Sequence, residues 1–88
     1  MKKSVTTSEY QVVVQLLREV RTSAGVTQVE LAEMLQQTQS FVSKMERGDS
    51  RLDVIQLRNV LAALGSSLPT FVGELEKRLS RGRKSQRR

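Results

Sequence analysis

Residues 27–48 read TQVELAEMLQQTQSFVSKMERG, and these letters predict two short helices joined by a tight turn. Thr27 and Glu30 have the spacing of a capping box, in which the hydroxyl caps the first turn and the glutamate reaches back to the cap's amide. A helix is therefore expected to begin at Gln28. Thr38 offers a second cap, and the helix that it starts is expected to end at the glycine that closes the stretch.

The second of these helices has two different sides. Val42 and Met45 are three residues apart, so both are expected in the core, where they would meet Leu31, Ala32 and Leu35 of the first helix. The opposite side is polar and faces outward, with Gln39, Ser40, Ser43 and Lys44. Two short helices of which the second has such a face form the unit that places a recognition helix in the major groove of DNA.

Three further helices are expected around this pair. Apolar residues recur every three or four positions from 8 to 24, from 54 to 64 and from 69 to 79. Glycines end the first two of these segments, and Pro69 suits the first turn of the last. The segment from 54 to 64 is the most apolar, and its expected core residues are Ile55, Leu57, Val60, Leu61 and Leu64. The sequence therefore predicts an all-α domain of five helices.

The two ends of the quoted stretch resemble the Xre/Cro family of repressors. Thr-Gln-x-Glu-Leu-Ala begins it at 27–32, and Ser-Lys-Met-Glu-Arg-Gly ends it at 43–48. The resemblance extends over roughly 16–75 and implies a lambda-repressor-like DNA-binding domain with a helix-turn-helix. The chain departs from the family at Gln36 and Gln37, where members usually carry a glycine that is often followed by an apolar residue.

The resemblance also implies roles for individual polar residues. Gln39 matches a glutamine that commonly reads adenine, because a side-chain amide pairs with the N6 and N7 edge of that base. Gln28 matches a glutamine that commonly contacts a phosphate and braces the adenine-reading glutamine, which is Gln39 here. Ser40, Ser43 and Lys44 share the outward side with Gln39, so they are expected to contact bases or phosphates.

Glu46 requires a structural explanation, because a carboxylate beside DNA phosphates is repelled. In the family, the glutamate at this place pairs with an arginine late in the first helix, which is Arg21 here, and bidentate pairing would hold the two helices together. Arg51, in the following loop, is expected to contact a phosphate. Phe41 has two open interpretations, contact with a thymine methyl group or packing over the turn.

The expected macromolecular partners are a duplex DNA operator and a second copy of the chain. The last helix carries more apolar residues than one narrow stripe needs, so a homodimer surface is expected there, formed by Leu68, Phe71, Val72, Leu75 and Leu79. The first helix has a similar excess at Val12, Val14 and Leu16. The alternative is that a domain this small needs all of these side chains in its core.

The domain is expected to span 8–79, with flexible residues at 1–7 and a disordered basic tail at 80–88. The formal net charge is +6, but the tail holds many of the positive charges, at Arg81, Arg83, Lys84, Arg87 and Arg88. The folded part is then nearly neutral, so basic composition alone does not indicate DNA binding. The tail is expected either to contact phosphate or to remain a solvated run of charge.

Composition argues against an enzyme and against a cofactor. The chain has no histidine and no cysteine, so it lacks the usual base-activated nucleophile, a disulfide framework and a thiolate metal ligand. Its apolar runs are too short to span a bilayer, and the residues after Met1 do not form a signal-peptide core. We therefore expect a cytoplasmic protein that binds no membrane, metal or cofactor.

The expected function is sequence-specific repression of transcription by a dimer on a pseudo-palindromic operator. The alternative is an antitoxin with the same fold, which neutralises a toxin protein and autoregulates its operon, and a co-purifying protein would identify it. A protein adaptor is disfavoured because Gln28, Gln39 and Lys44 are expected on one face. Single-stranded RNA binding is disfavoured because the chain's one tyrosine and two phenylalanines form no stacking platform.

Overall fold

Helices account for the regular structure of residues 7–82, the part of the chain that the computed structural model describes. They are α1 (Ser8–Ser23), α2 (Gln28–Leu35), α3 (Gln39–Arg47), α4 (Val54–Ala63) and α5 (Leu68–Gly82). Within these residues there is no strand, so the predicted all-α fold of five helices is confirmed. The predicted starts of the two short helices are also confirmed.

Short polar side chains fix where the first four helices begin. The N-cap residues Thr7, Thr27, Thr38 and Asp53 each accept a hydrogen bond from the backbone amide three residues further on. Thr27 and Asp53 belong to reciprocal capping boxes. In each box, the side chain at the third helical position accepts a hydrogen bond from the backbone amide of the cap residue. Such a cap typically stabilises a helix by about 1 kcal/mol. Helices as short as α2 and α3 still depend on tertiary packing.

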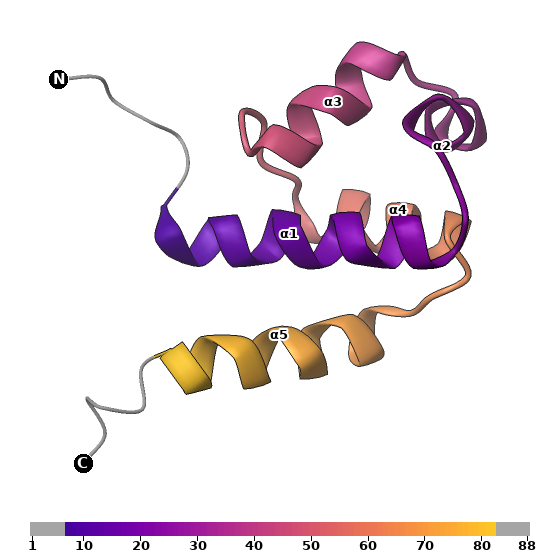
Figure 1. The fold of residues 1–88 in the computed structure, drawn as a ribbon. Helices are drawn as coiled ribbons and strands as arrows, with labels where there is room; N and C mark the ends of the chain where they lie inside the picture. The colour runs from indigo at the N-terminus through magenta and orange to yellow at the C-terminus, as the bar shows by residue number, and fades with distance from the viewer. Residues whose placement is uncertain (1–6, 83–88) are drawn as a thin grey trace, which may run out of the picture.

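The α1 helix is the support on which the recognition elements rest. It packs against α3 and α5, while α2 packs against α3 and α4. In Figure 1, α3 and α5 lie on opposite sides of α1, and α4 lies behind it. Because α1 and α2 together hold one side of α3, the other side of α3 is left for solvent or a ligand.

The core lies where the five helices meet. Its most deeply buried large side chains come from every helix, and they are Leu17, Leu31, Val42, Met45, Val60, Leu61 and Phe71. Burying one such side chain contributes roughly 1.5–3 kcal/mol, so this shared cluster sets the arrangement of the short helices. Within residues 7–82, no helix combines the length and the apolar character that a membrane span requires.

Three expectations about apolar residues need correction. Ile55 was expected in the core, but its place on the first turn of α4 leaves it 61% exposed. Phe71 was expected on a dimer surface, but it is only 2% exposed because α5 turns it into the core. Val14 and Leu16 of α1 are also buried, so the alternative interpretation, that a small domain needs these residues in its own core, is the correct one for them.

The α5 helix extends further than expected and is joined to α1 by an arginine. It continues to Gly82, past the expected boundary at 79. Arg78 forms two hydrogen bonds to the Glu19 carboxylate, at 2.8 and 3.2 Å, and a third to Glu74 at 3.0 Å. These hydrogen bonds lower the pKa values of both carboxyl groups. Residues 1–6 of the expected flexible segment at 1–7, and residues 83–88 of the expected basic tail at 80–88, lie outside the described residues.

Candidate nucleic-acid interface

The turn between α2 and α3 determines how the two helices meet. Gln36 ends α2 in the left-handed conformation, with φ 57° and ψ 44°. The amide of Gln37 then donates to the carbonyl of Ala32 at 2.8 Å, which closes the turn. Glycine adopts this conformation without strain, so Gln36 occupies it at a cost. The sequence located the turn, but it did not reveal that a glutamine takes the left-handed position.

One side of α3 is anchored in the protein and the other is polar. Val42 and Met45 are almost completely buried in the shared core, where α3 packs against α1 and α2. On the outward side, Gln39, Ser40 and Lys44 are exposed and Ser43 is half-buried. The structure therefore brings together the four α3 residues that the helical spacing placed on one side. They offer amide, hydroxyl and ammonium groups to a ligand.

Arg21 and Glu46 form a buried ion pair between α1 and α3. Arg21 Nε donates to Glu46 Oε2 at 2.6 Å, and Nη2 donates to Oε1 at 3.0 Å. The remaining arm of the guanidinium donates from Nη1 to the carbonyl of Val26 at 2.8 Å, which ties down the loop before α2. The two side chains are only 9% and 3% exposed. This bidentate pair fixes the orientation of α3 on α1.

Gln28 joins the same network from the first turn of α2. Its side-chain Nε2 donates to Glu46 Oε1 at 2.9 Å. The resemblance implied that Gln28 braces Gln39, whereas in the structure its amide is directed to Glu46. The carboxylate of Glu46 on α3 therefore accepts hydrogen bonds from Arg21 of α1 and from Gln28 of α2, and it links the three helices. Helical spacing alone did not indicate this third partner.

The environment of Glu46 keeps its carboxyl group ionised. Burial favours the neutral acid, but the hydrogen bonds from Arg21 and Gln28 and the charges of Arg21 and Arg18 outweigh it and hold the pKa of Glu46 below its ordinary value. The negative charge is therefore compensated inside the protein. This removes the objection that Glu46 would repel DNA.

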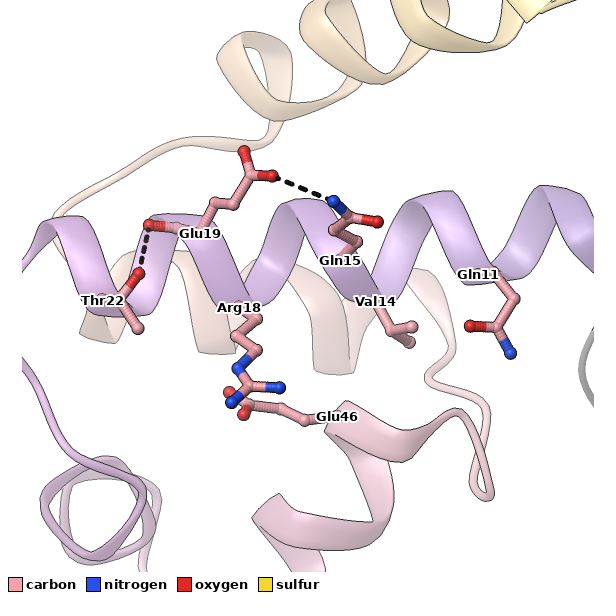
Figure 2. Close-up of a pocket in the computed structure, with 7 residues that line it drawn as sticks. All are labelled: Gln11, Val14, Gln15, Arg18, Glu19, Thr22 and Glu46. Carbon is pink, nitrogen blue, oxygen red and sulfur yellow. Dashed lines mark hydrogen bonds between the residues drawn. The ribbon is translucent and has the colours of Figure 1, made fainter.

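A polar groove lies along α1 beside Glu46 (Figure 2). It has a volume of about 430 Å³ and is lined by Gln11, Val14, Gln15, Arg18, Glu19, Thr22 and Glu46. In Figure 2, Arg18 extends from α1 toward Glu46, in agreement with its effect on the pKa of that carboxyl group. The two carboxylates of the groove are already bonded, Glu46 by Arg21 and Glu19 by Arg78. The groove therefore lies along the junction of α1 and α3, and its carboxylates already serve to hold helices together.

The loop after α3 is held by a tyrosine of α1. The guanidinium of Arg51 stacks 4.7 Å from the centre of the Tyr10 ring. The hydroxyl of Tyr10 accepts a hydrogen bond from the amide of Leu52 at 3.1 Å. Tyr10 thus holds the loop that carries Arg51, and the Arg51 side chain is exposed. Sequence reasoning assigned Tyr10 no role in this loop.

Phe41 and Arg47 differ from the expected set of contact residues. Phe41 is half-buried, packs against the core and lines a small pocket with Leu35 and Val60, which favours packing over contact with a thymine methyl group. Arg47 was not singled out from the sequence. Its Nη1 donates to Ser43 Oγ at 2.8 Å, and its Nε pairs with Asp49 at 2.9 Å. The four-residue spacing from Ser43 was the signal that could have identified it.

The expected dimer surface on α5 is smaller than the sequence indicated. With Phe71 in the core, Leu68, Leu75 and Leu79 are half-buried, and Val72 is 43% exposed. Leu68 and Leu75 also pack against the core cluster. Only part of this helix face is therefore left for a second subunit.

Comparisons with known proteins agree with this geometry. A family model described as "Helix-turn-helix" matches residues 17–71. An "XRE-family like protein" from Pseudomonas syringae pv. tomato str. DC3000 is 41% identical, with a TM-score of 0.75 over 80% of this chain and 85% of that one. The clp gene regulator ClgR of Corynebacterium glutamicum is 25% identical, with a TM-score of 0.70 over 91% of this chain and 89% of that one. A search of curated proteins finds no match.

Proposed function

The chain belongs to the XRE family of helix-turn-helix proteins, and on that basis we propose that it represses transcription by binding a pseudo-palindromic operator as a homodimer. Membership of the family makes the chain a DNA-binding transcriptional regulator. Operator symmetry, the homodimer and repression are the parts that the proposal adds. A bound dimer would repress by obstructing RNA polymerase.

The observation that carries the proposal is the polar side of α3, held rigidly by the network around Glu46. In the proposed complex α3 enters the major groove, and Gln39 at its first turn reads a base edge. Ser40, Ser43 and Lys44 supply further base or phosphate contacts from the same side. Because the network fixes α3 before DNA arrives, little ordering is needed on binding.

Phosphate contacts are proposed for the segments on either side of α3. Gln28 has two side-chain N–H groups, so it can donate one to Glu46 and the other to a phosphate oxygen. Arg51 is exposed and placed by Tyr10 in the loop that follows α3. Contacts of this kind set the register of the protein on the duplex and carry no sequence information directly.

Selection of bound sites from random duplexes, followed by footprinting, tests the proposal. Two inverted half-sites are the expected result. Gln39→Ala should then weaken binding by about 5- to 150-fold at duplexes with adenine in the contacted position, because a bidentate pairing contributes roughly 1–3 kcal/mol of discrimination. Gln11→Ala, which changes an exposed glutamine of α1, serves as the control. An equal loss on all sequences would contradict base reading by Gln39.

An antitoxin with the same fold is the second candidate. Val54 and Ile55 form the most exposed pair of large apolar side chains among residues 7–82, and they lie on α4 rather than on the polar side of α3. Such a pair suits a protein partner. A second protein that co-purifies in a fixed ratio and is released by Ile55→Glu would support the antitoxin. A pure homodimer that occupies its operator alone would support the repressor.

A further inference from the structure

Arg47 is the last residue of α3 and lies on its polar side. It follows Ser43 by four residues and Ser40 by seven, so the three side chains fall on one side of the helix. Arg47 is eight residues beyond Gln39, which is about 12 Å along the helix axis. Recognition helices read bases mainly with their N-terminal residues, so a long basic side chain at the other end is placed for the DNA backbone.

Two contacts hold Arg47 in this position. Its Nη1 donates to Ser43 Oγ at 2.8 Å, and its Nε donates to Asp49 Oδ2 at 2.9 Å. Asp49 comes directly after Gly48, whose φ of 81° ends the helix and turns the chain. The side chains of Arg47 and Asp49 are 57% and 54% exposed. The pair therefore lies in solvent at the edge of the candidate interface, where a ligand can reach it.

We propose that Arg47 contacts a backbone phosphate of the operator, and that Asp49 occupies its guanidinium in the free protein in place of that phosphate. This inference rests on the proposed DNA-binding function. A carboxylate and a phosphate accept the same charge-assisted hydrogen bonds from a guanidinium, so one can replace the other. Exposed ion pairs are weak, and phosphate can therefore displace Asp49.

The exchange gives Asp49 an effect opposite to that of Arg47. When DNA takes the guanidinium, the Asp49 carboxylate loses its partner and remains close to phosphates. Asp49 therefore opposes binding on every duplex and limits attachment to DNA of unrelated sequence. Removing its charge should strengthen binding, whereas removing the charge of Arg47 should weaken it.

Salt-dependent binding to two duplexes of equal length tests the inference. One duplex carries the selected operator and the other an unrelated sequence, and affinity is measured by fluorescence anisotropy over a range of salt concentrations. Arg47→Gln should lower the slope of log affinity against log salt by about 0.9 on both duplexes, since one phosphate contact is lost. Asp49→Asn should tighten binding by about two- to fivefold, the range set by exposed ion pairs.

Two controls match the charge changes. Arg58→Gln removes an exposed arginine of α4, and Glu76→Gln removes an exposed carboxylate of α5. Neither should reproduce the effects of the Arg47 and Asp49 variants. An Arg47→Gln slope equal to that of the wild type, a loss confined to the operator duplex, or weaker binding by Asp49→Asn would overturn the inference while leaving the proposed function intact. A wild-type protein that binds neither duplex would instead refute the proposed function itself, and this inference with it.

Discussion

Gln36 bears a conformational cost at the centre of the helix-turn-helix. Among residues 7–82 it is the non-glycine residue with positive φ, while Gly25, Gly48 and Gly65 take the corresponding positions after other helices. For an L-residue, the left-handed conformation costs roughly 1–2 kcal/mol because Cβ crowds the following carbonyl. The packing of α2 against α3 and α4, together with the hydrogen bond from the Gln37 amide to the Ala32 carbonyl, compensates for this cost.

Gln36→Gly should therefore stabilise the protein by about 0.5–1 kcal/mol. This value is the strain energy that glycine relieves, reduced by the cost of glycine's greater chain entropy in the unfolded state. The free energy of unfolding, measured by urea titration, checks this value. Gln37→Gly, one residue further along and without positive φ, should destabilise instead. Equal losses from the two variants would show that the backbone of Gln36 is not strained.

Residue types that act locally were the ones that sequence predicted best. The starts of α2 and α3 follow from Thr27 and Thr38 alone, since a cap depends on atoms within one turn. Ile55 and Phe71 were misplaced because helical spacing shows which residues share a side, but not which neighbouring helix covers it. The same limit hid the contact between Gln28 and Glu46, which depends on where two helices meet.

At the scale of elements, the ion pair between Arg21 and Glu46 joins α1 to α3, and the hydrogen bond from Gln28 to Glu46 joins α2 to the same carboxylate. Neither α2 nor α3 is long enough to be stable alone, so their mutual angle depends on the core and on the network of Arg21, Gln28 and Glu46. Removing one partner leaves the other charge buried without compensation, which typically costs about 3–5 kcal/mol. Removing both partners avoids that penalty.

Arg21→Ala and Glu46→Ala should each lower the free energy of unfolding by about 3 kcal/mol, and the double variant should lose less than the sum. A double-mutant cycle by urea unfolding gives the coupling energy directly. Glu46→Gln keeps the size of the side chain and provides a milder variant if Glu46→Ala fails to fold. Strictly additive losses would mean that the ion pair does not couple the two helices.

The same network predicts how stability depends on pH. The folded state lowers the pKa of Glu46 below its ordinary value of 4.5, so its stabilisation is complete above that pH and is lost as the pH falls through the lower folded value. Glu19 and Glu74 act in the same direction through Arg78. Glu46→Gln should therefore flatten, but not abolish, the decline in stability between about pH 5 and pH 2. An unchanged decline would show that Glu46 gains no stabilisation from its ionised form.

At the scale of the whole molecule, a single domain reads too little DNA. One short recognition helix contacts a few base pairs, and each good pairing contributes roughly 1–3 kcal/mol, so a monomer discriminates poorly among the competing sites of a genome. Two α3 helices in successive major grooves must lie about 34 Å apart, and a two-fold symmetric dimer meets this requirement on inverted half-sites. Among the exposed large apolar residues of 7–82, Val29 and Met34 lie on α2 of the helix-turn-helix itself, whereas Val72 on α5 and the pair Val54 and Ile55 at the start of α4 lie outside it and remain for such a dimer.

We predict that Val72→Glu separates the subunits, because it places a charge in the middle of the remaining apolar face of α5 while Leu68, Leu75 and Leu79 stay in place. Helical content should be unchanged, since Val72 is already partly exposed, whereas charging the buried Phe71 would unfold the domain. Operator binding should then weaken strongly and depend steeply on protein concentration.

Val54→Glu is the matched control, an identical substitution at a valine of α4 that is 59% exposed. Sedimentation of the three proteins, free and bound to the operator, measures the outcome. Dissociation by Val54→Glu alone would move the interface to α4, and a wild-type protein that stays monomeric on its operator would refute the dimer.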